Sequence, residues 1–169
     1  MSSEKMRKCL DEGARGGERH KGIKKKKPDM KEAREFVEKA LHNFSAMTDF
    51  HKQGYSDWSA SAGFYALYHG LLAILAKKGF ESRNQSCTFA LVEEMIQKGE
   101  VDITEEELMD IYSKDVTTDI EHSKKLFDIR EKIQYSARTE LSEQEFDELK
   151  KRVKALLDKL RLEVERGVE

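Results

Sequence analysis

Two apolar segments separated by a short polar break, within residues 56–94, constrain the fold of this chain more than any other feature. The first carries aromatic and small residues at helical spacing and ends at Lys77, Lys78 and Gly79. The second begins after the polar run 82–86. Because apolar or small residues lie on nearly every side of 58–78, we expect this segment to be a helix surrounded by other helices.

Apolar residues at intervals of three and four predict further helices before and after this segment. They lie at about 30–52, 85–98, around Leu108 and Ile111, 116–138 and 142–166. Pairs typical of helix starts precede three of them: Asp29 with Glu32, Thr104 with Glu107, and Ser142 with Glu145. The connections are short, so the predicted fold is all-α: an antiparallel up-and-down bundle of four to five long helices, without strands.

Composition agrees with long, solvent-exposed helices, because 38% of the residues are charged and Pro28 is the one proline. No apolar run approaches the roughly 20 residues that cross a bilayer, and we expect no membrane association. Cys9 and Cys87 form neither a disulfide framework nor a metal quartet, so the sequence predicts reduced thiols and a cytoplasmic protein. Cys87 falls on the apolar face of its predicted helix, where it would fill the core.

The charges are divided unevenly along the chain. Residues 1–28 contain ten Lys and Arg and four Asp and Glu, a charge of +6, whereas the remainder carries −8. Gly13, Gly16, Gly17 and Gly22 predict at most a short helix near 4–12. We therefore expect a partly flexible basic arm at 1–28 and a helical bundle at 29–169. The arm either contacts phosphates or is simply solvated.

Three stretches carry a resemblance to a known family: 59–69 (SASAGFYALYH), 79–85 (GFESRNQ) and 126–135 (LFDIREKIQY). Together they resemble the HEPN domain, a helical bundle named for nucleotide binding in higher eukaryotes and prokaryotes. The resemblance spans about 30–165. It implies a four- or five-helix bundle, often a homodimer, and often the partner of a nucleotidyltransferase in a toxin–antitoxin pair.

Some HEPN domains are metal-independent ribonucleases that use an arginine followed, after four to six residues, by a histidine. Here Tyr135 stands where a histidine would follow Arg130, and Arg83 has no histidine within seven residues. Arg15 and His20 have the spacing, but they lie in the arm, where we expect no fixed geometry. Tyrosine, with a pKa near 10, is a poor base at neutral pH. We expect no catalytic residue, metal or cofactor.

The predicted phosphate or nucleotide site consists of Arg83, Asn84, Arg130, Tyr135 and His69. Arg83 and Asn84 precede a helix, whose positive end favours anions. Arg130 would grip a phosphate while Tyr135 stacks or hydrogen-bonds. Each residue also has a purely structural interpretation: a surface arginine, a helix cap, an ion pair, a core tyrosine, a satisfied histidine. A shared site requires that Arg83 and Arg130 converge.

The leading hypothesis is therefore a HEPN-type module that is not a catalyst and binds a nucleotide, RNA or a nucleotidyltransferase-like protein. Two alternatives stay open. One is a ribonuclease toxin in which Tyr135 replaces the histidine, and the other is a dimerisation scaffold without a ligand. A homodimer fits all three, because the central helix is apolar around most of its circumference.

Overall fold

The structure is a computed structural model that describes residues 2–111, 133 and 136–168. It confirms the all-α class and adds a very small sheet. The elements are α1 (Ser2–Arg15), a 3-10 turn (Gly17–Arg19), β1 (Ile23–Lys25), α2 (Met30–Lys52), α3 (Ser56–Lys78), β2 (Phe80–Ser82), α4 (Gln85–Gln97), α5 (Glu105–Ile111) and α7 (Glu143–Glu165). The predicted helix 116–138 falls almost entirely outside the described residues.

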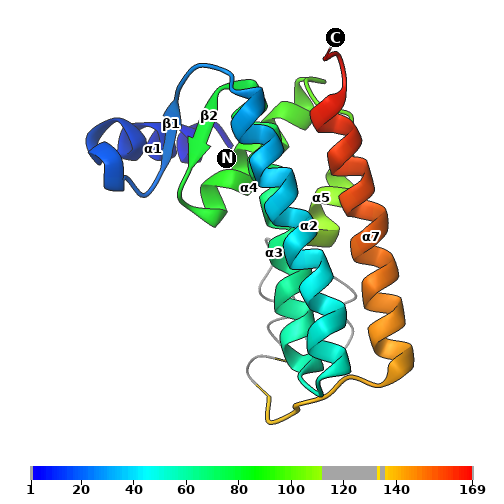
Figure 1. Cartoon of the computed structure of the whole chain (residues 1–169). Helices are drawn as coiled ribbons and strands as arrows, with labels where there is room; N and C mark the ends of the chain where they lie inside the picture. The colour runs from blue at the N-terminus through cyan, green and yellow to red at the C-terminus, as the bar shows by residue number, and fades with distance from the viewer. Residues whose placement is uncertain (1, 112–132, 134–135, 169) are drawn as a thin grey trace.

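The body of the molecule is formed by α2, α3 and α7, which lie side by side along their lengths (Figure 1). As expected, α3 is the central helix: Phe64, Leu67 and Leu71 are completely buried. At Gly70 a Cβ atom would lie 2.8 Å from Leu160 Cδ1 of α7, so glycine lets the two helices approach closely without displacing the Leu160 side chain. The main apolar core therefore follows the axis of α3.

Three predicted helix starts are confirmed by side-chain hydrogen bonds. Asp29 accepts from the backbone N–H of Glu32 at 2.9 Å, and Ser142 and Glu145 form a reciprocal capping box. Thr104 and Glu107 exchange the same two bonds ahead of α5. At the start of α3, the Ser56 hydroxyl accepts a bond from the backbone N–H of Leu141 at 2.6 Å. This bond ties α3 to the segment that leads into α7.

The N-terminal segment is more ordered than its glycines predicted. Its helix, α1, spans Ser2–Arg15 rather than the short stretch near 4–12, so the expectation against a long helix is wrong. Gly13 lies in the last turn of that helix, against β1: a Cβ atom on it would sit 1.8 Å from the Ile23 carbonyl oxygen, and one on Gly22 would sit 2.2 Å from that of Cys9. These glycines permit backbone contact between α1 and β1, instead of breaking the structure.

The expectation of a chain without strands is also wrong. β1 pairs with β2 in an antiparallel ladder that matches Ile23 with Ser82, Lys24 with Glu81 and Lys25 with Phe80. Ile23 is completely buried. We call residues 2–28 the N-terminal lobe. In Figure 1 this lobe projects sideways from the bundle, at the end where α3 runs into β2.

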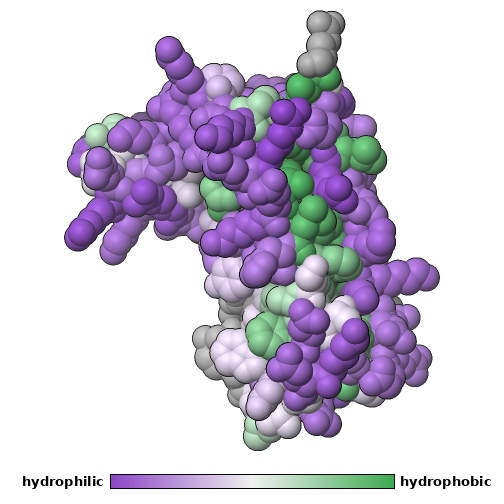
Figure 2. All heavy atoms as spheres, viewed as in Figure 1, coloured by the Kyte–Doolittle hydropathy of each residue, from purple (hydrophilic) through white to green (hydrophobic). Residues whose placement is uncertain are grey.

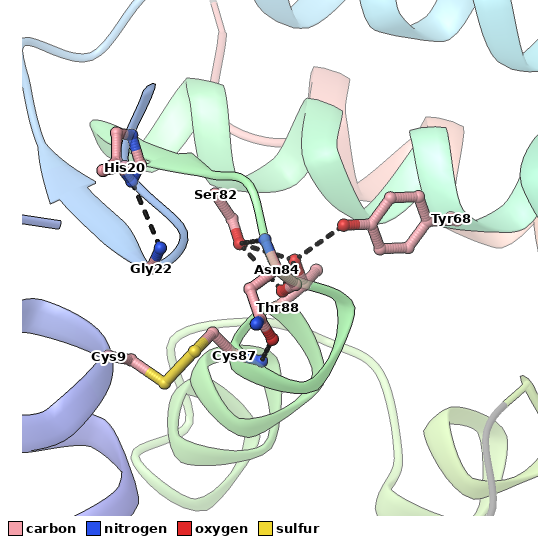
Figure 3. The surroundings of a disulfide bond; sticks show 8 residues. All are labelled: Cys9, His20, Gly22, Tyr68, Ser82, Asn84, Cys87 and Thr88. Carbon is pink, nitrogen blue, oxygen red and sulfur yellow. Dashed lines mark hydrogen bonds between the residues drawn. A yellow bond between two sulfur atoms is a disulfide. The ribbon is translucent and has the colours of Figure 1, made fainter. Parts of the chain in front are cut away.

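A disulfide between Cys9 of α1 and Cys87 of α4 corrects the prediction of two free thiols (Figure 3). Both cysteines are buried, and they are separated by 78 residues. Cys87 was correctly placed on the buried side of its helix, but it is bonded rather than a filler. The N-terminal lobe is thus fixed to the bundle both by the β-ladder and by a covalent bond.

By length and composition, α3 is the described helix that could cross a membrane, yet 72% of its apolar window is buried inside the fold. Such burial is what the central helix of a helical bundle requires.

The disulfide makes stability sensitive to reduction. Replacing both cysteines (Cys9→Ser with Cys87→Ser) should lower the free energy of unfolding by about 4 kcal/mol, because closing a loop of this length restricts the unfolded chain. Urea unfolding followed by circular dichroism measures the change. Dithiothreitol should destabilise the wild type similarly and leave the double variant unaffected. Equal stability of the wild type with and without the reductant would contradict the prediction.

Candidate functional site

Residues 81–88, which we call the junction, connect the end of α3 to the first turn of α4. Gly79 ends α3 with a φ of 85°, a conformation that favours glycine, and the chain then enters β2. Beyond the ladder, the backbone N–H of Arg83 donates to the Gly22 carbonyl at 3.1 Å. The Asn84 side chain accepts from the backbone N–H of Cys87 at 3.0 Å and so caps α4. The junction is therefore built against the N-terminal lobe.

A buried hydroxyl network fixes the junction to α3 (Figure 3). Thr88 Oγ1 lies 2.7 Å from Ser82 Oγ, 3.0 Å from the Asn84 carbonyl oxygen and 3.1 Å from the Tyr68 hydroxyl. Thr88 is completely buried and Tyr68 nearly so. Burial raises the pKa of Tyr68, which stays a neutral hydrogen-bonding group. The first turn of α4 thus has a fixed position and direction.

His20 lies at the contact between lobe and junction. Its side chain is completely buried, its Nδ1 accepts from the backbone N–H of Gly22 at 3.3 Å, and its Nε2 lies 3.2 Å from Glu81 Oε1. Arg83 Nε donates to the same carboxylate oxygen at 2.8 Å. Burial raises the pKa of Glu81, but the hydrogen bonds from Arg83 and His20 outweigh it and hold that pKa below its usual value. Glu81 is therefore a carboxylate.

Positive charge predominates on the outer side of the ladder. Lys24 is directly opposite Glu81, and Arg83 follows two residues later on the same face. Diagonal neighbours of this kind are about 7–8 Å apart. The Arg83 side chain remains 49% exposed despite its pairing with Glu81. Two cations therefore flank one carboxylate beside the positive end of α4.

A family model described as "HEPN domain" matches residues 33–163, well over half of the chain. The chain belongs to the HEPN family. No curated protein sequence matches it. The suspected family is thereby confirmed, and membership supports a helical module related to nucleotides or RNA. The matched region begins after the N-terminal lobe.

Two of the predicted site residues, Arg83 and Asn84, lie together at the junction of this HEPN domain. The Asn84 side-chain oxygen is occupied by the cap of α4, and the Arg83 guanidinium is engaged by Glu81. Both residues therefore have the structural roles that were the alternative to ligand binding: Asn84 is a helix cap, and Arg83 is a surface arginine in an ion pair. Arg83 nevertheless keeps an exposed face, whereas Asn84 contributes to any ligand site mainly by orienting α4.

His69 is not brought together with these two residues. Its Nδ1 lies 2.7 Å from the Tyr65 carbonyl oxygen and 3.2 Å from Asn43 Nδ2, so its contacts are with its own helix and with α2. The preceding residue, Tyr68, is the one that reaches α4. Burial, with a smaller contribution from Lys39, lowers the pKa of His69. It is a neutral, half-buried imidazole on another side of α3.

Arg130 and Tyr135 lie outside the described residues. Their predicted convergence with Arg83 accordingly stays a prediction.

Sequence reasoning missed that His20, Glu81 and Lys24 lie together at the β-ladder. The expectation that His20 lacks fixed geometry is wrong, because it is held by two hydrogen bonds. The spacing between Arg15 and His20 still yields no ribonuclease site here, since both ring nitrogens are engaged and the ring is sealed from solvent. Local spacing contains no signal that Glu81, 61 residues away, is the partner of His20.

Within the described ranges, no group of three or more His, Cys, Asp or Glu side chains is arranged to hold a metal ion. An exposed guanidinium such as that of Arg83 and an exposed ammonium such as that of Lys24 are groups that can bind a phosphate.

The Thr88 network should be sensitive to loss of its hydroxyl group. Thr88→Val keeps the shape but leaves the hydroxyls of buried Tyr68 and partly buried Ser82 without this partner, so the free energy of unfolding should fall by about 1–3 kcal/mol. Urea unfolding measures this. Adding Tyr68→Phe should recover part of the loss, because both members of one bond are then apolar. Failure of the double variant to recover any stability would contradict the proposed network.

His69 should titrate with a midpoint below 6.5 in an NMR experiment on its ring protons. Because its folded pKa is below the unfolded value, its contribution to stability is complete above about pH 6.5 and is lost as the pH falls through the folded midpoint. His69→Gln should remove both the resonance and this component of the pH dependence. A midpoint at or above 6.5 would show that the ring is not desolvated.

Proposed function

We propose that this HEPN domain is a binding module without catalytic activity, which recognises a phosphate group of a nucleotide or of RNA at the junction. Arg83 would contact the phosphate, Lys24 would add a second positive charge, and the first turn of α4 would present its positive end. The finer assignment goes beyond family membership, which supports a nucleotide- or RNA-related module in general.

The observation that carries the proposal is the position of Arg83. Its guanidinium is half exposed, it is oriented by Glu81 through one nitrogen, and it stands next to a capped helix start whose direction is fixed by buried hydrogen bonds. A guanidinium that donates to one carboxylate through a single nitrogen can donate through its other nitrogens to a second anion. Pre-orientation lowers the entropy lost when a ligand binds.

The absence of the ribonuclease spacing from the matched segment supports a role other than catalysis. Within residues 33–163, no arginine is followed by a histidine after four to six residues. The pair with that spacing, Arg15 and His20, has its histidine sealed inside the protein. The alternative in which Tyr135 replaces the histidine stays open.

The predicted partners and location are proposals that accompany this function. A nucleotidyltransferase-like protein in a toxin–antitoxin pair stays a predicted partner. An apolar strip visible between α2 and α7 (Figure 2) supports the predicted homodimer.

The disulfide weighs against the predicted cytoplasmic location, because disulfides rarely persist in reducing compartments.

Calorimetric titration with nucleotides and short single-stranded RNA tests the proposal. Arg83→Gln should weaken binding about tenfold, the effect of losing one hydrogen bond to a charged group. Arg161→Gln is the matched control, because Arg161 is 45% exposed and also paired with a carboxylate, Asp158 at 3.7 Å, but lies on α7. It should bind as the wild type does. No binding by the wild type, or equal losses in the two variants, would refute the proposed site.

The same preparations should leave labelled RNA intact at a high excess of protein. Cleavage that is lost in Tyr135→Phe would instead favour the ribonuclease alternative.

A further inference from the structure

The N-terminal lobe has the strongest concentration of positive charge in the chain. Residues 15–27 contain seven Lys and Arg and a single acidic residue, Glu18. Six of these seven side chains are exposed: Arg15, Arg19, Lys21, Lys24, Lys25 and Lys27. In Figure 2 most of the side chains on the visible face of this lobe are hydrophilic.

Most of this charge has no compensating partner among the described residues. Of the Lys and Arg side chains in the lobe, Lys8 and Lys26 are the two that lie within 4.0 Å of a carboxylate in the part of the chain that the structure describes. In the described part of the bundle, most Lys and Arg side chains do have such a partner: Lys31, Arg34, Arg83, Lys98, Arg138, Arg152, Lys154, Lys159, Arg161 and Arg166. The two regions therefore differ in net field as well as in composition.

The lobe holds these charges in fixed positions. Buried Ile23, the ladder between β1 and β2, and the Cys9–Cys87 disulfide attach it to α4 and to the end of α3. An array attached in this way does not lose the conformational entropy that a free basic arm loses on binding.

The charged surface is continuous with the proposed phosphate site. Arg83 is hydrogen-bonded through its backbone to Gly22, the residue after Lys21, and it is the diagonal neighbour of Lys24. A ligand phosphate at Arg83 would thus sit at one end of a series of cations that continues along β1 to Lys27.

We infer that the N-terminal lobe is a docking surface for the sugar–phosphate backbone of a single-stranded RNA, which extends the junction from a one-phosphate site to a site for several consecutive phosphates. This inference rests on the proposed function and specifies its ligand as a polynucleotide. Each phosphate neutralised by a lysine or arginine releases counterions, so unpaired cations contribute the largest share of such binding.

A nucleic acid fits the lobe better than an anionic membrane surface does. Peripheral membrane binding combines basic residues with apolar side chains that enter the lipid. The exposed large hydrophobic side chains of the described residues are Phe50, Tyr55, Trp58, Tyr65, Leu162 and Val168, and all of them lie outside the lobe.

The experiment measures the affinity of the intact, oxidised protein for adenosine monophosphate and for oligoadenylates of increasing length, between 50 and 200 mM salt. The wild type should bind longer strands progressively tighter. The variant Lys25→Gln with Lys27→Gln removes two exposed lobe lysines outside the proposed one-phosphate site and should reduce the salt slope by about 1.4, since each contact to a single strand contributes about 0.7. The control is Lys52→Gln with Lys151→Gln, two exposed bundle lysines without a carboxylate of the described residues within 4.0 Å, which should leave the slope unchanged.

The outcomes separate this inference from the proposed function. Binding that depends on Arg83 but is independent of strand length would overturn the lobe as a docking surface and leave the one-phosphate site intact. Length-dependent binding that is reduced by the lobe variant but not by Arg83→Gln would overturn the junction instead. Equal slopes in the lobe and control variants, or tighter binding to phosphatidylserine vesicles than to RNA, would overturn the inference.

Discussion

Three residue pairs between β1 and β2 determine how Lys24, Glu81 and Arg83 lie in the candidate site. They place Lys24 opposite Glu81 and, through the next hydrogen bond, Arg83 opposite Gly22. A shift of one residue in register would exchange the faces of Ile23 and Lys24, so that Ile23 would turn outward and Lys24 inward. Burial of Ile23 contributes about 1.5–3 kcal/mol and makes such a shift unfavourable. A sheet too small to be stable alone is thus held in one register by the helices around it.

Much of the bundle could be predicted from the sequence because its determinants are local. The bounds of α2 follow from apolar spacing and from Asp29, whose cap bond is made within three residues. The capping box of Ser142 and Glu145 is equally local. The burial of α3 was predictable as well, since a helix that is apolar on nearly all sides has to be surrounded. The predicted extent of the family resemblance, about 30–165, agrees with the matched segment 33–163, because the motifs that carry the resemblance are short local runs of sequence.

The lobe and half of the candidate site could not be predicted, because they depend on residues far apart in the chain. Glycines such as Gly13 and Gly22 are typical of a flexible arm. Whether a glycine breaks a helix or permits close backbone contact depends on the segment that packs opposite it, which the local sequence does not reveal. Cys9 and Cys87 are 78 residues apart, with no pattern that pairs them. Arg83 was correctly placed at a helix start, yet its carboxylate partner, two residues earlier, becomes relevant only because β2 is a strand.

Because Arg83 is paired with Glu81, the junction and the lobe would contribute differently to the proposed binding. In the proposed complex a phosphate would share the Arg83 guanidinium with Glu81, which already neutralises part of its charge, so the phosphate would gain less there than at an unpaired cation. Lys24, Lys25 and Lys27 have no carboxylate of the described residues within 4.0 Å, so each of them could release counterions fully when a phosphate binds. In the proposed complex, Arg83 would contribute mainly geometry, through its fixed orientation, and the lobe would contribute mainly affinity. A ligand with a single phosphate would contact only the oriented Arg83, whereas a strand that continues along β1 would also contact the lobe lysines.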